Sequence, residues 1–267
     1  MYNDQGRYDM AFVDLKFYSN VLGMQTEVAV IIPQGGGNIG EIGVENNTRP
    51  GPYKCLYLLH GLSDDHTIWM RRTAIERYAT NYGICVVMPK ADKSFYTDMK
   101  YGMKYYTHIA KEIPAVIREF FNVSSKREDN FICGLSMGGY GALKIALREC
   151  DSFAAGAGLS PCSDMKALVG AGGYEEIMVP IFGEDYNVKD EDDILWLADA
   201  KKDDPNRPRL FIGIGTNDFL YENNKALHKK LTELGYDYTY REGPGVHSWD
   251  FWDEYIKHVL WWMFGNK

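Results

Sequence analysis

The regular alternation of short apolar runs with longer stretches of helical periodicity is the feature that most constrains this fold. Apolar runs at 53–59, 84–89, 131–135, 153–159 and 209–215 alternate with helical stretches at 71–82, 105–121, 138–149 and 222–234. A last run at 237–241 precedes an aromatic helical stretch at 249–264. Strands that alternate with helices predict βαβ units, and continuous apolar strands are typical of sheets covered on both faces. We therefore expect a mostly parallel, doubly wound sheet.

Two segments depart from this rhythm. Residues 10–19 and 26–33 alternate apolar and polar side chains around a turn that contains Gly23, which predicts an N-terminal antiparallel hairpin. Residues 161–208 carry mixed helical fragments and the acidic run 190–193, so we expect a small insertion over the carboxyl edge of the sheet. The acidic run lacks the spacing of a calcium loop and is interpreted as a solvated surface. No internal boundary divides residues 1–267, which indicates a single domain.

Charge and composition narrow the class of partner. The net charge is −8 and the basic residues form no stripe, so nucleic acid is not expected as a partner. The sequence has neither a signal peptide nor 18 uninterrupted apolar residues, and we therefore expect a cytoplasmic protein without a membrane span. Cys-x-x-Cys and His-Glu-x-x-His patterns are missing, so no zinc site is predicted. Cys55, Cys85 and Cys133 lie in strand-like runs, where a reduced thiol packs as a small apolar group.

The strongest local signal for chemistry is a G-x-S-x-G motif at residues 134–138, between an apolar strand and a helical stretch. A serine nucleophile needs a sharp turn that exposes its hydroxyl, and the flanking glycines let the neighbouring backbone approach that turn. The alternative interpretation is an ordinary glycine-rich turn. Because strand, turn and helix fall in register, we predict that Ser136 is a nucleophile.

A serine hydroxyl becomes reactive when a histidine removes its proton and a carboxylate orients that histidine. His247 lies in a glycine-rich loop directly after the last predicted strand, which is where an α/β-hydrolase presents its base. Three other histidines lie within helical stretches and are expected to be surface or packing residues: His108, His228 and His258. We therefore predict His247 as the general base.

The acid should fall between nucleophile and base in the chain. Asp218 follows the apolar run 209–215 and would emerge at the carboxyl edge of the sheet, near the returning His247. Asp237 begins the next strand and would lie at the opposite edge. Asp218 is therefore the predicted acid.

Two backbone amides are candidates for stabilising a developing oxyanion. One is the N–H of Met137, directly after the nucleophile, and the other is the N–H of Leu62, in the turn that ends the run 53–59. His60, at the start of that turn, is expected to be structural. A second glycine-rich segment, 35–40, matches G-x-G-x-x-G, but no helix follows it, so no dinucleotide site is predicted.

The chain resembles the tributyrin esterase branch of the esterase D and S-formylglutathione hydrolase group, which is related to feruloyl and acetyl-xylan esterases. The resemblance covers nearly the whole chain and is carried by residues 60–73, 96–102, 134–142, 215–221 and 245–252. It implies the α/β-hydrolase fold, cofactor-free hydrolysis of short-chain acyl or aryl esters, and a dimer or tetramer. It places the triad on Ser136, Asp218 and His247, and the oxyanion donors on Leu62 and Met137. Residues 1–8 and 161–208 match least well.

Aromatic side chains near the predicted site bear on the substrate. Trp69 and Trp249 flank the predicted oxyanion loop and base, and Trp196 lies in the insertion, so all three are candidate pocket walls, although indoles beside a helix are often core residues. We favour a general short-chain carboxylesterase acting on a small-molecule ester. A feruloyl or acetyl esterase acting on plant-polysaccharide fragments is the next candidate. The acidic insertion counts against an S-formylglutathione-type thioesterase, whose substrate carries two carboxylates.

Two further alternatives stay open. An acyl-enzyme can pass its acyl group to a sugar hydroxyl instead of water if that acceptor is better positioned. A catalytically silent binding protein could also retain the fold, since fold alone does not establish chemistry. The intact triad positions disfavour the silent protein.

Overall fold

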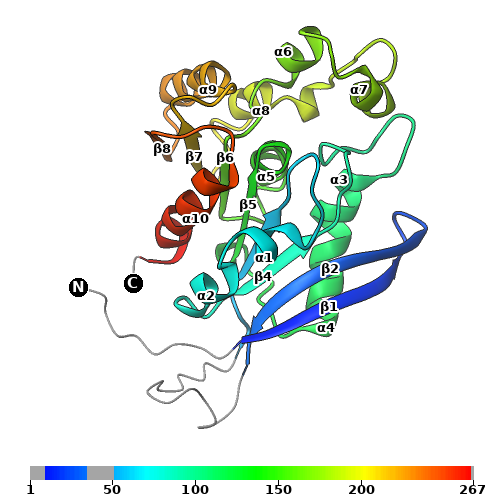
Figure 1. The fold of residues 1–267 in the computed structure, drawn as a ribbon, viewed down its shortest axis with the longest axis vertical. Coiled ribbons are helices and arrows are strands. Elements are labelled where there is room, and N and C mark those ends of the chain that lie inside the picture. Colours follow the sequence, from blue (N-terminus) through cyan, green and yellow to red (C-terminus); the bar gives the residue numbers. More distant parts are fainter. Residues whose placement is uncertain (1–9, 35–50, 266–267) are drawn as a thin grey trace.

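One eight-stranded sheet organises the computed structural model, which describes residues 10–34 and 51–265 (Figure 1). The order of the strands across the sheet is β1-β2-β4-β3-β5-β6-β7-β8. Their bounds are β1 Met10–Ser19, β2 Met24–Pro33, β3 Cys55–Leu59, β4 Cys85–Pro89, β5 Asn130–Leu135, β6 Ala155–Leu159, β7 Arg209–Gly215 and β8 Tyr238–Gly243.

Strand direction confirms the predicted combination of a hairpin with a parallel sheet. β1 pairs with β2, and β2 with β4, in antiparallel fashion, whereas all pairs from β4 through β8 are parallel. The chain passes from β3 to β4 on one side and then to β5 on the other side of β3. In open α/β sheets such a reversal leaves a crevice at the carboxyl ends of the two central strands. The turns after β3 and β5 carry Leu62 and Ser136.

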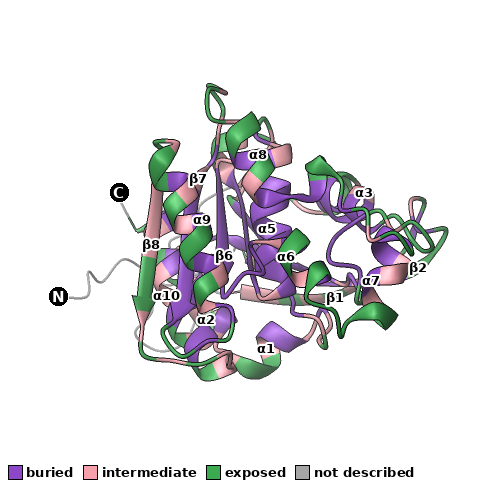
Figure 2. Ribbon diagram, turned by 90° about the horizontal axis from the view of Figure 1, so that it is seen from above, coloured by how far each residue is buried: buried purple, intermediate pink, exposed green. Residues whose placement is uncertain are grey.

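Helices cover both faces of the sheet, as a doubly wound fold requires. The helices on one face are α1 Ile68–Arg72, α2 Ile75–Thr80 and α10 Trp249–Phe264; those on the other include α4 Ile113–Phe120, α5 Met137–Arg148, α8 Ile194–Ala200 and α9 Tyr221–Glu233. Successive side chains of β3 alternate between the two cores: Leu56 and Leu58 pack with the first set, Tyr57 and Leu59 with the second. Figure 2 shows the buried residues concentrated in the central strands and in α5.

The predicted helix at 71–82 is wrong in its detail, because two short helices replace it. Thr73 adopts an extended conformation between α1 and α2. Its hydroxyl donates to the Trp69 carbonyl at 2.6 Å and accepts from the Ile75 N–H at 3.1 Å. A threonine side chain that bonds the backbone in this way competes with the helical ladder. The stretch predicted at 105–121 is helical from 105 to 120, as α3 Tyr105–Thr107, the π-helical turn η1 His108–Glu112 and α4, and Phe121 is extended.

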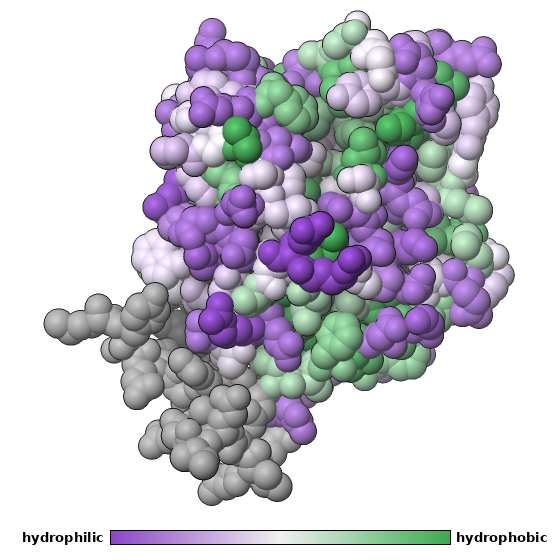
Figure 3. Space-filling model, in the orientation of Figure 1, coloured by the Kyte–Doolittle hydropathy of each residue, from purple (hydrophilic) through white to green (hydrophobic). Residues whose placement is uncertain are grey.

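The insertion between β6 and β7 contains α6 Met165–Gly170, α7 Glu175–Phe182, the short turn η3 Asp190–Asp192 and α8. The arrowhead of β8 marks the carboxyl edge of the sheet in Figure 2, and α6 and α7 lie toward that side. Figure 3, in the orientation of Figure 1, shows hydrophobic residues gathered in a hollow below α6 and α7. The insertion therefore helps to shape the surface at the edge where Leu62 and Ser136 emerge.

The interpretation of residues 190–193 as a solvated acidic surface is wrong for half of the run. Asp192 and Asp193 are 4% and 7% exposed. Asp192 pairs with Lys144 of α5 at 3.0 Å, and Asp193 pairs with Lys166 of α6 at 2.9 Å. Asp193 also caps α8 by accepting from the N–H of Leu195 at 2.9 Å. The sequence did not reveal these cations because Lys144 lies 48 residues before Asp192 and Lys166 lies 27 residues before Asp193.

The remaining expectations about organisation concern cysteines, membranes and the glycine-rich segment. All five cysteines are buried and carry free thiols. Among the helices of the described residues, none combines the length and the apolar character that crossing a membrane needs. The segment 35–40 lies outside the described residues.

Candidate active site

The turn between β5 and α5 holds Ser136 in a conformation that few residues adopt. Its φ is 52° and its ψ is −116°, and its N–H donates to the Leu159 carbonyl at 2.8 Å. The two glycines of the motif are required by close contact with neighbouring backbone. A Cβ at Gly134 would lie 2.3 Å from the Gly138 carbonyl oxygen, and one at Gly138 would lie 2.5 Å from that of Leu59. The motif thus packs the start of α5 against β3 and leaves Ser136 partly exposed at the turn.

The structure brings Ser136, His247 and Asp218 together in one chain of hydrogen bonds. The Ser136 Oγ lies 2.9 Å from His247 Nε2. On the other side of the ring, His247 Nδ1 lies 2.9 Å from Asp218 Oδ2 and 3.1 Å from Oδ1. A carboxylate at Nδ1 fixes the proton on that nitrogen and leaves Nε2 free to accept the serine proton. The geometry is therefore suited to general-base activation of the Ser136 hydroxyl.

Asp218 lies three residues after β7 with its side chain fully buried. Burial raises the pKa of Asp218, but hydrogen bonds from His247, from the Leu220 N–H and from the Ser160 hydroxyl outweigh burial and hold that pKa below its usual value. The Leu220 bond is 2.9 Å long. The carboxylate is thus ionised where it faces the imidazole. The rival Asp237 precedes β8 and bonds the start of β7 through its carbonyl, at the other edge of the sheet.

Leu62 and Met137 present backbone N–H groups that donate no hydrogen bond within the described part of the chain. Met137 is the first residue of α5, where helical amides have no partner of their own. The loop of Leu62 is fixed by the buried His60, whose Nδ1 bonds the Gly61 carbonyl at 2.8 Å and whose Nε2 accepts from the Ala91 N–H at 3.0 Å. Burial lowers the pKa of His60, so its ring stays neutral and structural. Both amides are free to bind an oxyanion.

The three tryptophans considered as pocket walls lie in different environments. The proposal for Trp69 is corrected, because its indole is 1% exposed and donates to the Leu59 carbonyl at 3.0 Å inside the core. Trp249 is partly exposed and packs edge-on against Trp69, with 5.2 Å between ring centroids. Trp196 is 44% exposed on α8. Trp69 is one of the buried residues of α1.

Four residues beside the triad were not predicted from the sequence. Phe219 and Val246 are 69% and 51% exposed and directly adjoin Asp218 and His247 in the chain. The Phe219 ring lies 4.6 Å from the His247 ring. Trp252 and Ser160 contact the triad from the buried side. Phe219 and Val246 could have been predicted from the sequence, because they are the chain neighbours of the predicted acid and base.

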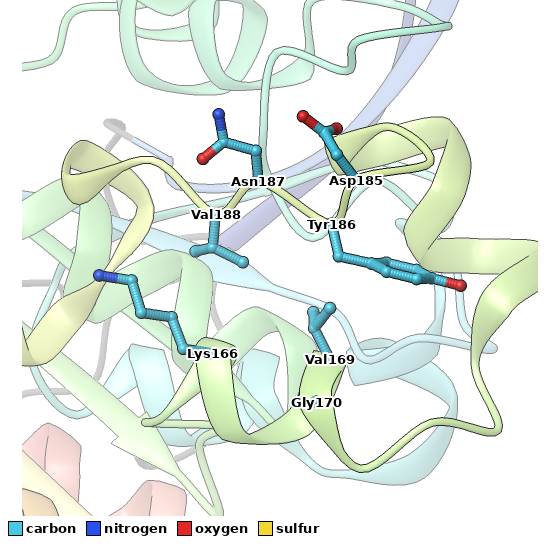
Figure 4. A pocket seen from close by; sticks show the side chains of 7 residues that line it. All are labelled: Lys166, Val169, Gly170, Asp185, Tyr186, Asn187 and Val188. Carbon is cyan, nitrogen blue, oxygen red and sulfur yellow. The ribbon is translucent and has the colours of Figure 1, made fainter.

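Two cavities lie along the insertion rather than at the triad. A cavity of about 430 Å³ is lined by Lys166, Val169, Gly170, Asp185, Tyr186, Asn187 and Val188. Figure 4 shows Val169 and Val188 facing each other across it, whereas the side chains of Asp185 and Asn187 point away from the two valines. A second cavity, of about 400 Å³, lies between the 97–100 loop, α7 and the 187–192 segment. Neither lining includes Ser136, Asp218 or His247.

Asp14, Glu27 and His66 form a cluster of the kind that can hold a metal ion. The His66 Nε2 lies 3.9 Å from Asp14 and 3.8 Å from Glu27. Two lysines already neutralise these carboxylates: Lys16 at 2.9 Å from Asp14, and Lys90 at 3.5 Å from Glu27. We therefore assign no metal to this cluster, and no step at the triad calls for one.

Comparisons with known proteins show the family of this chain. The model of the Esterase family matches residues 19–262, which is most of the chain. The chain belongs to the Esterase family. The chain is similar to FphF, a fluorophosphonate-binding serine hydrolase of Staphylococcus aureus, with 37% identity, 96% and 98% of the two chains covered, and a TM-score of 0.85.

Two further relatives of this esterase carry specific names. An S-formylglutathione hydrolase, FrmB, from Staphylococcus aureus is 38% identical, with 96% and 99% of the chains covered and a TM-score of 0.83. An acetyl esterase from Caldicellulosiruptor saccharolyticus is 30% identical over 264 residues, 95% of this chain and 98% of the relative. A ferulic acid esterase at 21% identity and a TM-score of 0.78 shares the fold. The chain is thus a carboxylic ester hydrolase with the α/β-hydrolase fold.

Proposed function

We propose that this esterase hydrolyses short-chain carboxylic esters through an acyl-enzyme on Ser136. The observation that carries the proposal is the continuous hydrogen-bond chain from Ser136 Oγ through His247 to Asp218, with both links at 2.9 Å. It starts at a serine whose unusual backbone conformation presents the hydroxyl at the carboxyl edge of the sheet.

The first half-reaction forms the acyl-enzyme. The Ser136 Oγ attacks the ester carbonyl carbon while His247 Nε2 takes the hydroxyl proton. The carbonyl oxygen becomes an oxyanion, to which the N–H groups of Leu62 and Met137 donate. His247 then gives its proton to the leaving alcohol oxygen as the carbon–oxygen bond breaks. Ionised Asp218 stabilises the imidazolium throughout.

The second half-reaction releases the acid. A water molecule loses a proton to His247 Nε2 and attacks the acyl carbon, and the same two amides hold the second oxyanion. Collapse of this intermediate returns the proton to the Ser136 Oγ and frees the carboxylic acid. No cofactor takes part in either half.

The surroundings of the triad support a small apolar acyl group. Phe219 and Val246 present exposed apolar surface directly beside the acid and base. The aromatic wall that would have favoured a feruloyl group is weakened, because Trp69 is a core residue. A short aliphatic chain gains from such surface without needing a deep aromatic slot.

S-formylglutathione is the second candidate substrate, and the relative named FrmB favours it. The objection from the acidic insertion is weaker than the sequence suggested, because Asp192 and Asp193 are paired with lysines. Thioester cleavage would use the same triad, with a thiol in place of the leaving alcohol.

The test compares the wild type, Ser136→Ala and Ser125→Ala in the hydrolysis of 4-nitrophenyl butyrate. Ser125 is an exposed serine and serves as the matched control. We expect Ser136→Ala to lose on the order of 10⁴-fold or more in kcat and Ser125→Ala to match the wild type. Equal activity of Ser136→Ala would overturn the proposal. A parallel panel of 4-nitrophenyl acetate, methyl ferulate and S-formylglutathione then ranks the substrate classes.

A further inference from the structure

Trp252, on the first turn of α10, touches both the predicted base and a second buried serine. Its side chain is 6% exposed. The indole ring meets the His247 ring edge-on, with 4.9 Å between centroids and 90° between planes. Its Nε1–H donates to the Ser160 Oγ at 3.1 Å. The rigid Trp252 side chain therefore constrains both the position of His247 and the orientation of the Ser160 hydroxyl.

Ser160 directly follows β6, the strand between β5 and β7. It is completely buried, its φ is 48°, and its N–H donates to the Gly213 carbonyl at 2.7 Å. Non-glycine residues rarely keep a positive φ unless the surrounding structure enforces it. This serine is thus held between the strand that leads to Ser136 and the strand that leads to Asp218.

The Ser160 hydroxyl can donate one hydrogen bond. Because its oxygen accepts from Trp252, the proton must point to another acceptor, and a buried hydroxyl rarely lacks one. The Asp218 carboxylate is the acceptor that fits, because the Ser160 side chain contributes to lowering the pKa of Asp218.

We propose that Trp252 and Ser160 are positioning residues of the triad: the indole fixes the His247 ring and aims the Ser160 hydroxyl, which donates to Asp218. The inference rests on the proposed function of Ser136, Asp218 and His247. Neither residue touches substrate. The hydrogen bond from Ser160 stabilises the negative charge of Asp218 and fixes the rotamer of the Asp218 side chain. Trp252 packs against the imidazole of His247.

The experiment uses Ser160→Gly, Ser160→Ala and Trp252→Phe, with Trp262→Phe as the control on the same helix. Glycine accepts the φ of 48° without strain, so Ser160→Gly removes the hydroxyl while leaving the backbone relaxed. Trp252→Phe keeps an aromatic ring but removes the N–H. Trp262 packs against Phe211 and Arg209, away from the triad. Kinetics are normalised to active sites by phosphonate titration.

We expect both Ser160 variants to lose roughly tenfold in kcat for 4-nitrophenyl butyrate, with KM within about twofold of wild type. The acid limb of the kcat/KM profile should move to higher pH, because an Asp218 charge that Ser160 no longer shares stabilises protonated His247 more strongly. Trp252→Phe should lower kcat and move the acid limb in the same directions, but by smaller amounts. Trp262→Phe should leave both kcat and the acid limb unchanged.

Wild-type kcat and an unshifted acid limb in Ser160→Gly would overturn the inference. So would a loss confined to Ser160→Ala, since that result would assign the effect to backbone strain. The proposed function fails by a different result, namely full activity of Ser136→Ala, so the two claims are separable.

Discussion

Two polar groups of α5, one at its N-terminus and one in its second half, lie in opposite environments. At its N-terminus, Ser136 is partly exposed and hydrogen-bonds a histidine that can exchange its proton. Two turns further along the helix, Lys144 is completely buried and bonds Asp192 at 3.0 Å, Thr97 at 2.7 Å and the Phe95 carbonyl at 3.3 Å. The polar groups of both clusters have hydrogen-bond partners, but Ser136 is partly accessible to solvent and Lys144 is not.

Within one helix, the Ser136 cluster is suited to catalysis and the Lys144 cluster stabilises the fold. The Ser136 cluster joins the ends of three strands to the edge where substrate can arrive. The Lys144 cluster joins α5 to the insertion through Asp192, and the Tyr140 hydroxyl reinforces it by donating to the Asp192 carbonyl at 2.6 Å. Breaking the first cluster should change turnover and leave stability intact, and breaking the second should do the reverse.

Asp218→Asn should give the largest effect. The asparagine amide would offer an N–H to His247 Nδ1 and favour the wrong tautomer, so we expect a loss of roughly 10⁴-fold in kcat. Asp237→Asn is the control and should retain wild-type kcat, since Asp237 lies at the opposite edge of the sheet. Steady-state kinetics with 4-nitrophenyl butyrate measure both. A comparable loss in Asp237→Asn would contradict the assignment of the acid.

Lys144→Met should be the largest perturbation of stability. Removing Lys144 takes away the nearest cation of the buried Asp192, at 3.0 Å, and leaves only Arg148 at 3.6 Å, so we expect a loss of roughly 3 kcal/mol in the free energy of unfolding. Urea denaturation measures this loss. Lys144→Met combined with Asp192→Leu should recover part of it, because both charges are then removed. The separation of the two clusters would be wrong if Lys144→Met lowered kcat per titrated active site and left stability unchanged.

The pH dependence of stability sharpens the same contrast. Burial lowers the pKa of Lys144 to about 8 in the folded protein, from 10.5. Between these values the unfolded chain binds more protons than the folded one, so the contribution of Lys144 to stability rises with pH from about 8 to 10.5. The difference in unfolding free energy between wild type and Lys144→Met should therefore shift in favour of wild type over this window. A flat difference would show that Lys144 titrates normally.

Asp193→Ala should give the smallest effect. It removes the N-cap of α8 and the pair with Lys166, and we expect a loss of about 1 kcal/mol in stability with unchanged kcat. The exposed neighbour Asp190 is the control, and Asp190→Ala should stay within about 0.5 kcal/mol of wild type. Thermal or urea unfolding distinguishes them. Equal effects of the two variants would remove the distinction between buried and solvated members of the acidic run.

The sequence was most informative where local pattern and function coincide. Alternating apolar and polar side chains predicted the hairpin. Apolar runs that alternate with helical stretches predicted the parallel strands and the helices on both faces, because the burial of a strand depends on the pattern of its consecutive residues. The residues Ser136, Asp218 and His247 were found by their positions after predicted strands, and the structure brings them into contact. The split of the helix at Thr73 depends on a side-chain hydrogen bond that periodicity does not register.

Long-range pairing accounts for what the sequence analysis missed. The acidic run 190–193 looked solvated because Lys144 lies 48 residues from Asp192 in the chain. Trp69 looked like a pocket wall, although its indole bonds the backbone of β3 within the core. Ser160 and Trp252 carry no motif, and their relation to the triad appears only when β6 and α10 are placed beside Asp218 and His247.

The most direct test of the central claim, that Ser136 is the nucleophile, is mass spectrometry after reaction with a fluorophosphonate. The probe transfers its phosphonyl group to an activated serine with loss of fluoride, and peptide mapping locates the adduct. We predict one adduct on Ser136, which is abolished in Ser136→Ala and forms much more slowly in Asp218→Asn. An adduct on another residue, or none on an enzyme that hydrolyses 4-nitrophenyl butyrate, would contradict it.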